Sequence, residues 1–346
     1  MKYFIVVAFC MGLKCALSQG VGEWTWMKGD STYANDYTDM HSYGVKGTYS
    51  DSIIVPKLYG SVYWSNGNRL YLLGGSAPDL INYVSNSQNT MWEYNVDSNK
   101  WRWLKGEEYN HLDNFILDYW GIQGSGDSIT FPVLRESSAG CTDYDGNFWL
   151  FGGYSENDLW EYNIVTNVWT WMKGSVFGIY HHYGTQGVPD SLNNPPPGPF
   201  GEMWADKQGN LWLYGGEAMS GYQWYQTVWR YNIATNVWTW MSGDTLPLTP
   251  PPVYDTLNVF NAINTPGGRE NNSTHWVDSM GNFYVYGGFM FYPYGEYDDL
   301  WKYDVTLNQW ACIKAESSAS YISYCTTVNL PSGRSEATGW VDRDGY

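Results

Sequence analysis

Basic residues are scarce in this sequence, and charge of any kind is limited. Lys and Arg number 18 against 35 Asp and Glu, which gives a formal net charge of −17, and charged residues make up only 15% of the chain. Binding to nucleic acid requires clustered Lys and Arg that neutralise phosphates, and docking on anionic lipid requires the same cations. The composition therefore argues against both kinds of partner, and the acidic surface is expected mainly to keep the protein soluble.

Long apolar runs are confined to the first residues. Residues 3–13 are apolar, Lys2 precedes them, and Ala16-Leu17-Ser18 offers small residues for a cleavage site. The run is too short to span a bilayer, and the combination predicts an export signal over residues 1–18. A buried N-terminal strand is the alternative. Removal of the signal takes away Lys2 and Lys14 and moves the net charge from −17 to −19, and we expect the mature protein to be secreted.

Cysteine and histidine are too few to organise the fold. Of five cysteines, two lie in the signal, and Cys141, Cys312 and Cys325 remain in the mature chain. Because this number is odd, any disulfide framework is minor, and Cys312–Cys325 is the candidate pair in an oxidising compartment. The five histidines stand at different offsets from the preceding tryptophan. No ring of metal ligands is implied, and we expect no metal and no cofactor.

Aromatic residues and glycine are abundant instead. The chain holds 21 Trp, 31 Tyr and 38 Gly. A disordered chain would lack the aromatic residues, and a helical protein would not combine so much glycine with so many β-forming residues between turns. The composition therefore predicts a packed all-β protein.

A repeated pattern organises the whole chain. The segment Trp24-Thr-Trp26 returns at 101–103, 169–171, 238–240 and, altered to Trp-Ala-Cys, at 310–312, with spacings of 77, 68, 69 and 72 residues. Each repeat also holds a Trp-x-Tyr segment whose tyrosine precedes the next of these tryptophans by seven residues, and a glycine pair. The glycine pairs are Gly74-Gly75, Gly152-Gly153, Gly215-Gly216 and Gly287-Gly288. Four matches at one fixed offset indicate a structural repeat.

Each repeat predicts four short antiparallel strands. A turn such as Gly146-Asn147 joins the first two strands, the second strand runs into the glycine pair, the third is Trp-x-Tyr, and an asparagine such as Asn167 turns the chain into Trp-x-Trp. Aromatic residues two positions apart lie on one face of a strand. Burying one Trp removes roughly 150–250 Å² from water, which is about 4–6 kcal/mol gross, and this requires a second sheet stacked on the first. Radial repetition supplies that sheet and predicts a β-propeller, with the glycine pairs where strands crowd near the axis.

These motifs resemble kelch repeats. The glycine pair and the spaced Tyr and Trp fit that pattern, and the long period with its Trp-Thr-Trp-Met-Lys-Gly segments is similar to the secreted, long-looped kelch proteins related to the galactose oxidase propeller. The resemblance covers about residues 22–346 and includes a Pro-x-x-Arg ahead of the first strand at Pro132/Arg135, Pro266/Arg269 and Pro331/Arg334. It implies that these arginines contact the neighbouring blade. Two repeats depart from the pattern, with Lys57 directly after Pro56 and Phe200 directly after Pro199, so we expect a weaker interblade contact there.

The repeat divides the mature chain, residues 19–346, into segments. We expect a fourth strand of a closing blade at about 22–28, four complete blades at 56–105, 131–173, 195–242 and 266–314, and the start of another blade at 331–346. Kelch propellers usually have six or seven blades, closed by a terminal strand. The resemblance therefore implies that this chain is a truncated part of a longer product.

Unequal connections suggest where a ligand binds. The turns between strands one and two, and between strands three and four, are short. The connections from strand two to strand three, and from strand four to the next blade, are long or variable. In an up-and-down blade these two sets of connections emerge on the same face. Loops that vary on a fixed scaffold commonly carry binding. Aromatic residues without a counterpart in the short loop 154–159 are the ligand-binding candidates: Tyr222, Trp224, Tyr225, Phe291, Tyr292 and Tyr294. The alternative is that these rings only pack loops together, as we expect of the recurring segments 43–47, 120–124 and 183–187.

Catalytic signatures are thin. Galactose oxidase-like enzymes hold copper with tyrosines and histidines and cross-link a tyrosine to a cysteine, but the mature cysteines fall on core strands or, for Cys325, in a loop without a matching histidine. Adjacent histidines such as His181-His182 on an exposed loop seldom bind a metal. Asn271 and Asn272 both begin Asn-x-Ser/Thr sequons and are glycosylation candidates.

The sequence thus predicts an extracellular recognition module that presents an aromatic loop face to an unidentified protein or glycan, without catalysis. Two alternatives stay open. One is a secreted galactose oxidase-related copper oxidase or another carbohydrate-active enzyme. The other is part of the ectodomain of a cell-surface receptor whose anchor follows residue 346.

Overall fold

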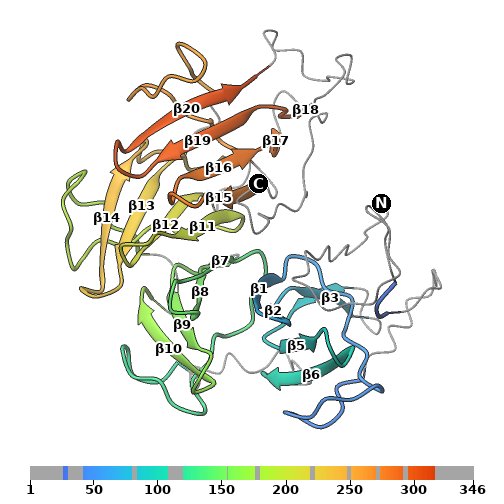
Figure 1. Ribbon diagram of the computed structural model, residues 1–346. Coiled ribbons are helices and arrows are strands. Elements are labelled where there is room, and N and C mark those ends of the chain that lie inside the picture. The colour runs from blue at the N-terminus through green and yellow to red at the C-terminus, as the bar shows by residue number, and fades with distance from the viewer. Residues whose placement is uncertain are drawn as a thin grey trace.

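Four antiparallel sheets make up the protein. The computed structural model describes residues 26–29, 42–79, 84–107, 120–153, 155–175, 180–218, 223–247, 251–269, 273–290 and 295–315. Within these ranges every regular element is a β-strand, and no helix is long and apolar enough to cross a membrane. Four four-stranded antiparallel sheets follow one another along the chain as the blades of a β-propeller (Figure 1). The predicted fold, an all-β propeller with four complete blades, is confirmed.

The blades use their strands in chain order. The first contains β1 (Val62–Asn66), β2 (Arg69–Leu73), β5 (Met91–Asn95) and β6 (Lys100–Lys105). The second contains β7 (Ala139–Thr142), β8 (Phe148–Phe151), β9 (Leu159–Asn163) and β10 (Val168–Lys173). The third contains β11 (Gly201–Ala205), β12 (Asn210–Gly215), β13 (Val228–Asn232) and β14 (Val237–Ser242). The fourth contains β15 (Thr274–Val277), β16 (Phe283–Tyr286), β19 (Leu300–Asp304) and β20 (Gln309–Lys314).

Two short hairpins interrupt this order. They are β3 (Ser76–Asp79) with β4 (Val84–Ser87) in the first blade, and β17 (Phe289–Met290) with β18 (Gly295–Glu296) in the fourth. In Figure 1 the first strand of each blade, β1, β7, β11 or β15, faces the middle of the arc, and β6, β10, β14 and β20 lie at its outside.

The turn between the third and fourth strands explains the seven-residue spacing of the repeat. In every blade the Trp-x-Tyr tyrosine donates its hydroxyl hydrogen bond to the side chain of an asparagine five residues later, as Tyr162 does to Asn167 at 2.6 Å. Asn167 has a φ of 58°, and its three counterparts have a φ of 54°. Asparagine adopts this left-handed conformation more readily than most residues. The tyrosine therefore stabilises the turn that joins the third strand of the blade to the fourth.

Aromatic side chains fill the spaces between blades, as predicted. Trp64 of the first blade stacks on Phe148 of the second with ring centres 5.3 Å apart, and Trp204 of the third blade stacks on Phe283 of the fourth at 3.7 Å. The Trp-x-Tyr tryptophans of all four blades are at most 1% exposed. The packing of each sheet against the next thus excludes water from these aromatic rings.

The glycine pairs lie at the ends of the second strands, one strand away from the innermost one. Gly74 shows why glycine is needed there: its φ is 66°, and a Cβ atom would lie 2.6 Å from the carbonyl oxygen of Arg135 in the next blade. The neighbouring Gly75 donates its N–H to that same oxygen at 2.9 Å. Close approach of two blades, and not crowding on the axis itself, therefore accounts for this glycine.

The long connections before each blade fold along its outer edge. Gly47, Gly124 and Gly187 donate their backbone N–H to the carbonyl oxygens of Trp103, Trp171 and Trp240 in the outermost strands. Isolated antiparallel bridges extend this pairing in all four blades, for example between Asp127 and Trp169. The recurring segments 43–47, 120–124 and 183–187 are thus loop-folding devices, and they cover strand edges that would otherwise be open to pairing with another chain. That the two sets of connections gather on one face stays a prediction.

Candidate functional site

Insertions after the glycine pairs distinguish the blades on one face. In the first and fourth blades the hairpins β3–β4 and β17–β18 begin directly after the glycine pair, and in the third blade Glu217 forms a bridge with Trp224 at the same place. In the second blade residues 155–158 lead straight into β9. We call the surface formed by these three insertions the hairpin face. It is the part of the described scaffold where the blades differ most.

The hairpins are fixed at their bases by backbone hydrogen bonds. Ser76 and Tyr59 exchange N–H to carbonyl bonds of 2.7 and 2.9 Å, which adds the segment before β1 to the β3–β4 hairpin. In the third blade Ala218 donates to Gln223 at 2.7 Å and Tyr225 donates to Gly216 at 2.9 Å. These bonds hold the insertions in defined positions above the blades.

Two of the aromatic ligand-binding candidates lie inside the protein. Trp224 is 1% exposed and Tyr225 is 8% exposed, so in this structure neither presents a ring face at the surface. Both residues belong to the third-blade insertion, and their backbone pairs with Glu217 and Gly216 at its base. Tyr222, Phe291, Tyr292 and Tyr294, and the sequon residues Asn271 and Asn272, lie outside the described residues. Ligand binding at the aromatic candidates and glycosylation at the sequons stay predictions.

Two of the three Pro-x-x-Arg arginines, Arg135 and Arg269, have a structural role inside their own blades, and Arg334 lies outside the described residues. Arg135 binds Asp158 through Nη1 at 3.1 Å and Nη2 at 2.9 Å, and both side chains are almost fully buried. Arg269 pairs with Asp299 in the same way in the fourth blade. The expected contact with the neighbouring blade is made by the Arg135 backbone, which bonds to Gln88 and Gly75, and not by its guanidinium.

Each of these aspartates also holds a tryptophan. Asp158 accepts a hydrogen bond from the Trp160 indole N–H at 2.5 Å, and Asp299 accepts one from Trp301 at 2.7 Å. In the first and third blades, which lack the arginine, a threonine takes the place of the aspartate: Thr90 binds Trp92 and Thr227 binds Trp229, both at 3.1 Å. At this position of the blade, the aspartate thus occurs together with a buried arginine that neutralises it, and the neutral threonine occurs where the arginine is missing.

A pocket of about 370 Å³ lies among the innermost strands, with Cys141, Trp276 and Tyr63 among its lining residues. Burial raises the pKa of the Cys141 thiol well above its usual value, and the nearby Asp143 carboxylate adds to the shift. The thiol therefore stays protonated at neutral pH and is a poor nucleophile. Cys312 is buried in β20, where burial raises the pKa of its thiol to about 12. Its predicted partner Cys325 lies outside the described residues, so that disulfide stays a prediction.

His275 of β15 and Glu202 of β11 join the third and fourth blades beside this pocket. His275 Nδ1 contacts Glu202 Oε2, and the other oxygen of Glu202 accepts a hydrogen bond from Ser273 at 2.9 Å. Burial lowers the pKa of His275, but the charge and the hydrogen bond of Glu202 outweigh that effect and raise it above its usual 6.5. Across the described ranges, no three His, Cys, Asp or Glu side chains converge as a metal-ligand set.

The fold defines the class of this protein as a β-propeller of four-stranded antiparallel blades. No protein-family model matches the chain. The relation to kelch proteins therefore depends on the sequence motifs alone.

Proposed function

We propose that this propeller is a secreted, kelch-type recognition module that binds a protein or a glycan on its hairpin face and has no catalytic activity. The observation that carries the proposal is the inequality of the insertions after the glycine pairs. Three blades carry one and the second blade does not, although the four-stranded frame is the same in all four. Loops that vary on a constant frame are typical of binding surfaces.

Aromatic side chains supply the contact area in this proposal. Tyr222 belongs to the third-blade insertion, and Phe291, Tyr292 and Tyr294 belong to the fourth-blade insertion. Rings with a polar tip give large contact areas at interfaces. Trp224 and Tyr225 of the third-blade insertion are buried, so they are not counted among these contact residues. The export signal and the paired sequons support an extracellular, glycosylated protein.

The test compares the parent protein with the triple variant Phe291→Ala/Tyr292→Ala/Tyr294→Ala on arrays of glycans and of cell-surface proteins. A ligand found with the parent should bind the triple variant at least 10-fold more weakly, as expected when interface anchors are truncated. The matched control is Tyr144→Ala, which removes a ring that is 59% exposed and follows β7 at a first-to-second-strand turn. Unchanged affinity of the triple variant would contradict the proposal.

A separate assay addresses the catalytic alternative. The secreted protein is analysed for copper and for peroxide formation on simple sugars. Stoichiometric copper together with turnover would replace the binding function by an oxidase function. The recognition proposal expects neither.

A further inference from the structure

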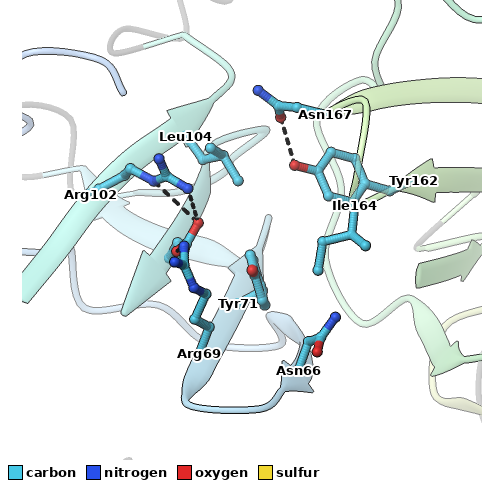
Figure 2. A pocket seen from close by; sticks show the side chains of 9 residues that line it. Asn66, Arg69, Tyr71, Arg102, Leu104, Tyr162, Ile164 and Asn167 are labelled. Carbon is cyan, nitrogen blue, oxygen red and sulfur yellow. Dashed lines mark hydrogen bonds and ion pairs between the residues drawn. The ribbon is translucent and has the colours of Figure 1, made fainter. Parts of the chain in front are cut away.

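A second pocket lies between the first and second blades, away from the hairpin face. Its volume is about 390 Å³, and Figure 2 shows its two walls: Asn66, Arg69, Tyr71 and Arg102 come from the first blade, and Tyr162 and Asn167 from the second. Asn66 ends β1 and Asn167 lies in the turn before β10, so the pocket is at the end of the blades that carries the short turns. Pockets of about 300–1,000 Å³ typically hold small ligands.

An unusual ion cluster forms one wall of this pocket. The Glu93 side chain is 1% exposed, and its Oε1 accepts a hydrogen bond from Arg69 Nη1 at 2.6 Å. Its Oε2 accepts a bond from Arg102 Nε at 3.1 Å, and Arg102 Nη2 and the Tyr49 hydroxyl also contact the carboxylate. Both oxygens of Glu93 are therefore already occupied.

The two arginines have no counterparts in the other blades. The residue that starts the second strand or directly precedes it is asparagine elsewhere, at Asn147, Asn210 and Asn282. The residue between the Trp-x-Trp aromatics is threonine or alanine elsewhere, at Thr170, Thr239 and Ala311. Positions that repeat in every blade serve the frame, whereas Arg69 and Arg102 are specific to one blade and to this pocket.

The ion cluster holds two arginines, although one would be enough to neutralise the Glu93 carboxylate. One arginine would neutralise Glu93, and the second leaves a net charge of about +1 in a chain whose net charge is −17. Among the described residues, Arg69 bonds only through Nη1, and Arg102 only through Nε and Nη2. Both guanidinium groups thus keep N–H donors that no described protein group accepts.

The hydroxyl group of a tyrosine in the same pocket also has no hydrogen-bond partner among the described residues. Tyr71 is 3% exposed and lines the pocket, and no described residue forms a hydrogen bond with its hydroxyl. Burial, with a contribution from the Glu93 charge, raises the pKa of Tyr71 to about 12. The hydroxyl therefore remains protonated at neutral pH and is available as a donor.

We propose that this interblade pocket binds one acidic sugar unit, with Arg69 and Arg102 holding its carboxylate and Tyr71 donating to one of its oxygens. Guanidinium groups match the planar geometry of a carboxylate. The amide groups of Asn66 and Asn167 at the pocket suit sugar hydroxyls, and the small volume suits a single ring. This site is independent of the hairpin face, and either proposal can fail without the other.

Calorimetric or NMR titration of the full chain with glucuronic acid tests this inference. Glucose serves as the neutral analogue, and acetate as the charge without the ring. Glucuronic acid should bind at least 10-fold more tightly than either. Arg69→Gln should weaken that binding at least 10-fold, because it removes a charge-assisted bond, and Tyr71→Phe should weaken it several-fold while keeping the ring.

The control is Arg230→Gln, which removes an arginine at the Glu93 position of the third blade, where it lies over the Trp212 ring. It should bind glucuronic acid like the parent. Thermal unfolding of each variant checks that the fold persists, which we expect for Arg69→Gln because that side chain is 44% exposed. Equal binding of glucose and glucuronic acid, or full affinity in both Arg69→Gln and Arg102→Gln, would overturn the inference. Equal binding of acetate would show that the sugar ring is not recognised.

Discussion

Arg135 and Asp158 form a two-point ion pair in the interior of the second blade, and the same carboxylate orients the indole of Trp160. Arg269, Asp299 and Trp301 repeat the arrangement in the fourth blade. The first and third blades solve the same problem with a neutral threonine. The repeats therefore use two interchangeable ways to satisfy one buried indole, and arginine and aspartate occur together.

The variant Asp158→Thr should be strongly destabilised. It leaves Arg135 buried without its counter-charge, which costs about 3–5 kcal/mol. The double variant Arg135→Leu/Asp158→Thr imitates the first blade, where Leu58 stands four residues before β1 as Arg135 stands four before β7. It should recover at least half of the loss. Urea unfolding measures both, and a double variant less stable than Asp158→Thr would contradict this account.

The His275–Glu202 contact should make stability depend on pH. Because the pKa of His275 is raised in the folded state, protonated histidine favours folding: the contribution is complete below pH 6.5 and is lost as the pH rises through the higher folded pKa. The free energy of unfolding should therefore fall across that window. In Glu202→Gln, which removes the cause of the raised pKa, this fall should be smaller or absent. Tyr63 also faces Glu202, but burial raises its pKa above 10.0, so it stays neutral throughout. Equal slopes in both proteins would count against this interpretation.

Removing the ring that closes an outer edge should promote aggregation. Trp120 lies 5.2 Å from Trp160 and 5.1 Å from Trp171, and it fixes the segment that pairs with β10. Trp120→Ala should cost about 3–5 kcal/mol and also expose the strand edge. Below the melting temperature, light scattering should rise faster for Trp120→Ala than for Trp64→Ala. The second variant loses a core ring but leaves the strand edge covered. Ile122→Ala, in the same segment but 76% exposed, should behave like the parent. Equal scattering from Trp120→Ala and Trp64→Ala would mean that the edge is unimportant.

The candidate sites were predicted less completely than the frame. The sequence marked Trp224 and Tyr225 as surface rings, yet both are buried. An aromatic residue in a loop carries no periodic signal of the side it faces, so the sequence could not predict this. Arg69 and Arg102 were not singled out, although comparing the repeats position by position would have shown that each is specific to one blade. What no such comparison shows is that both reach Glu93, since three strand residues and Tyr49 meet there only after the chain has folded.

The sequence by itself determined the strands, their order and the four blades. Side chains alternate along a strand, asparagine and glycine allow the turns, and aromatic rings on one face of a sheet require a second sheet to cover them. These are local features, and each repeat shows them again. Only the tertiary structure decided which polar groups meet. The guanidinium of Arg135 could bond within its blade or across to the next, and the long connections could project from a face or fold along an edge. Such choices depend on distances between segments far apart in the chain, and burial then selects the arrangement that leaves the fewest charges and backbone groups unpaired.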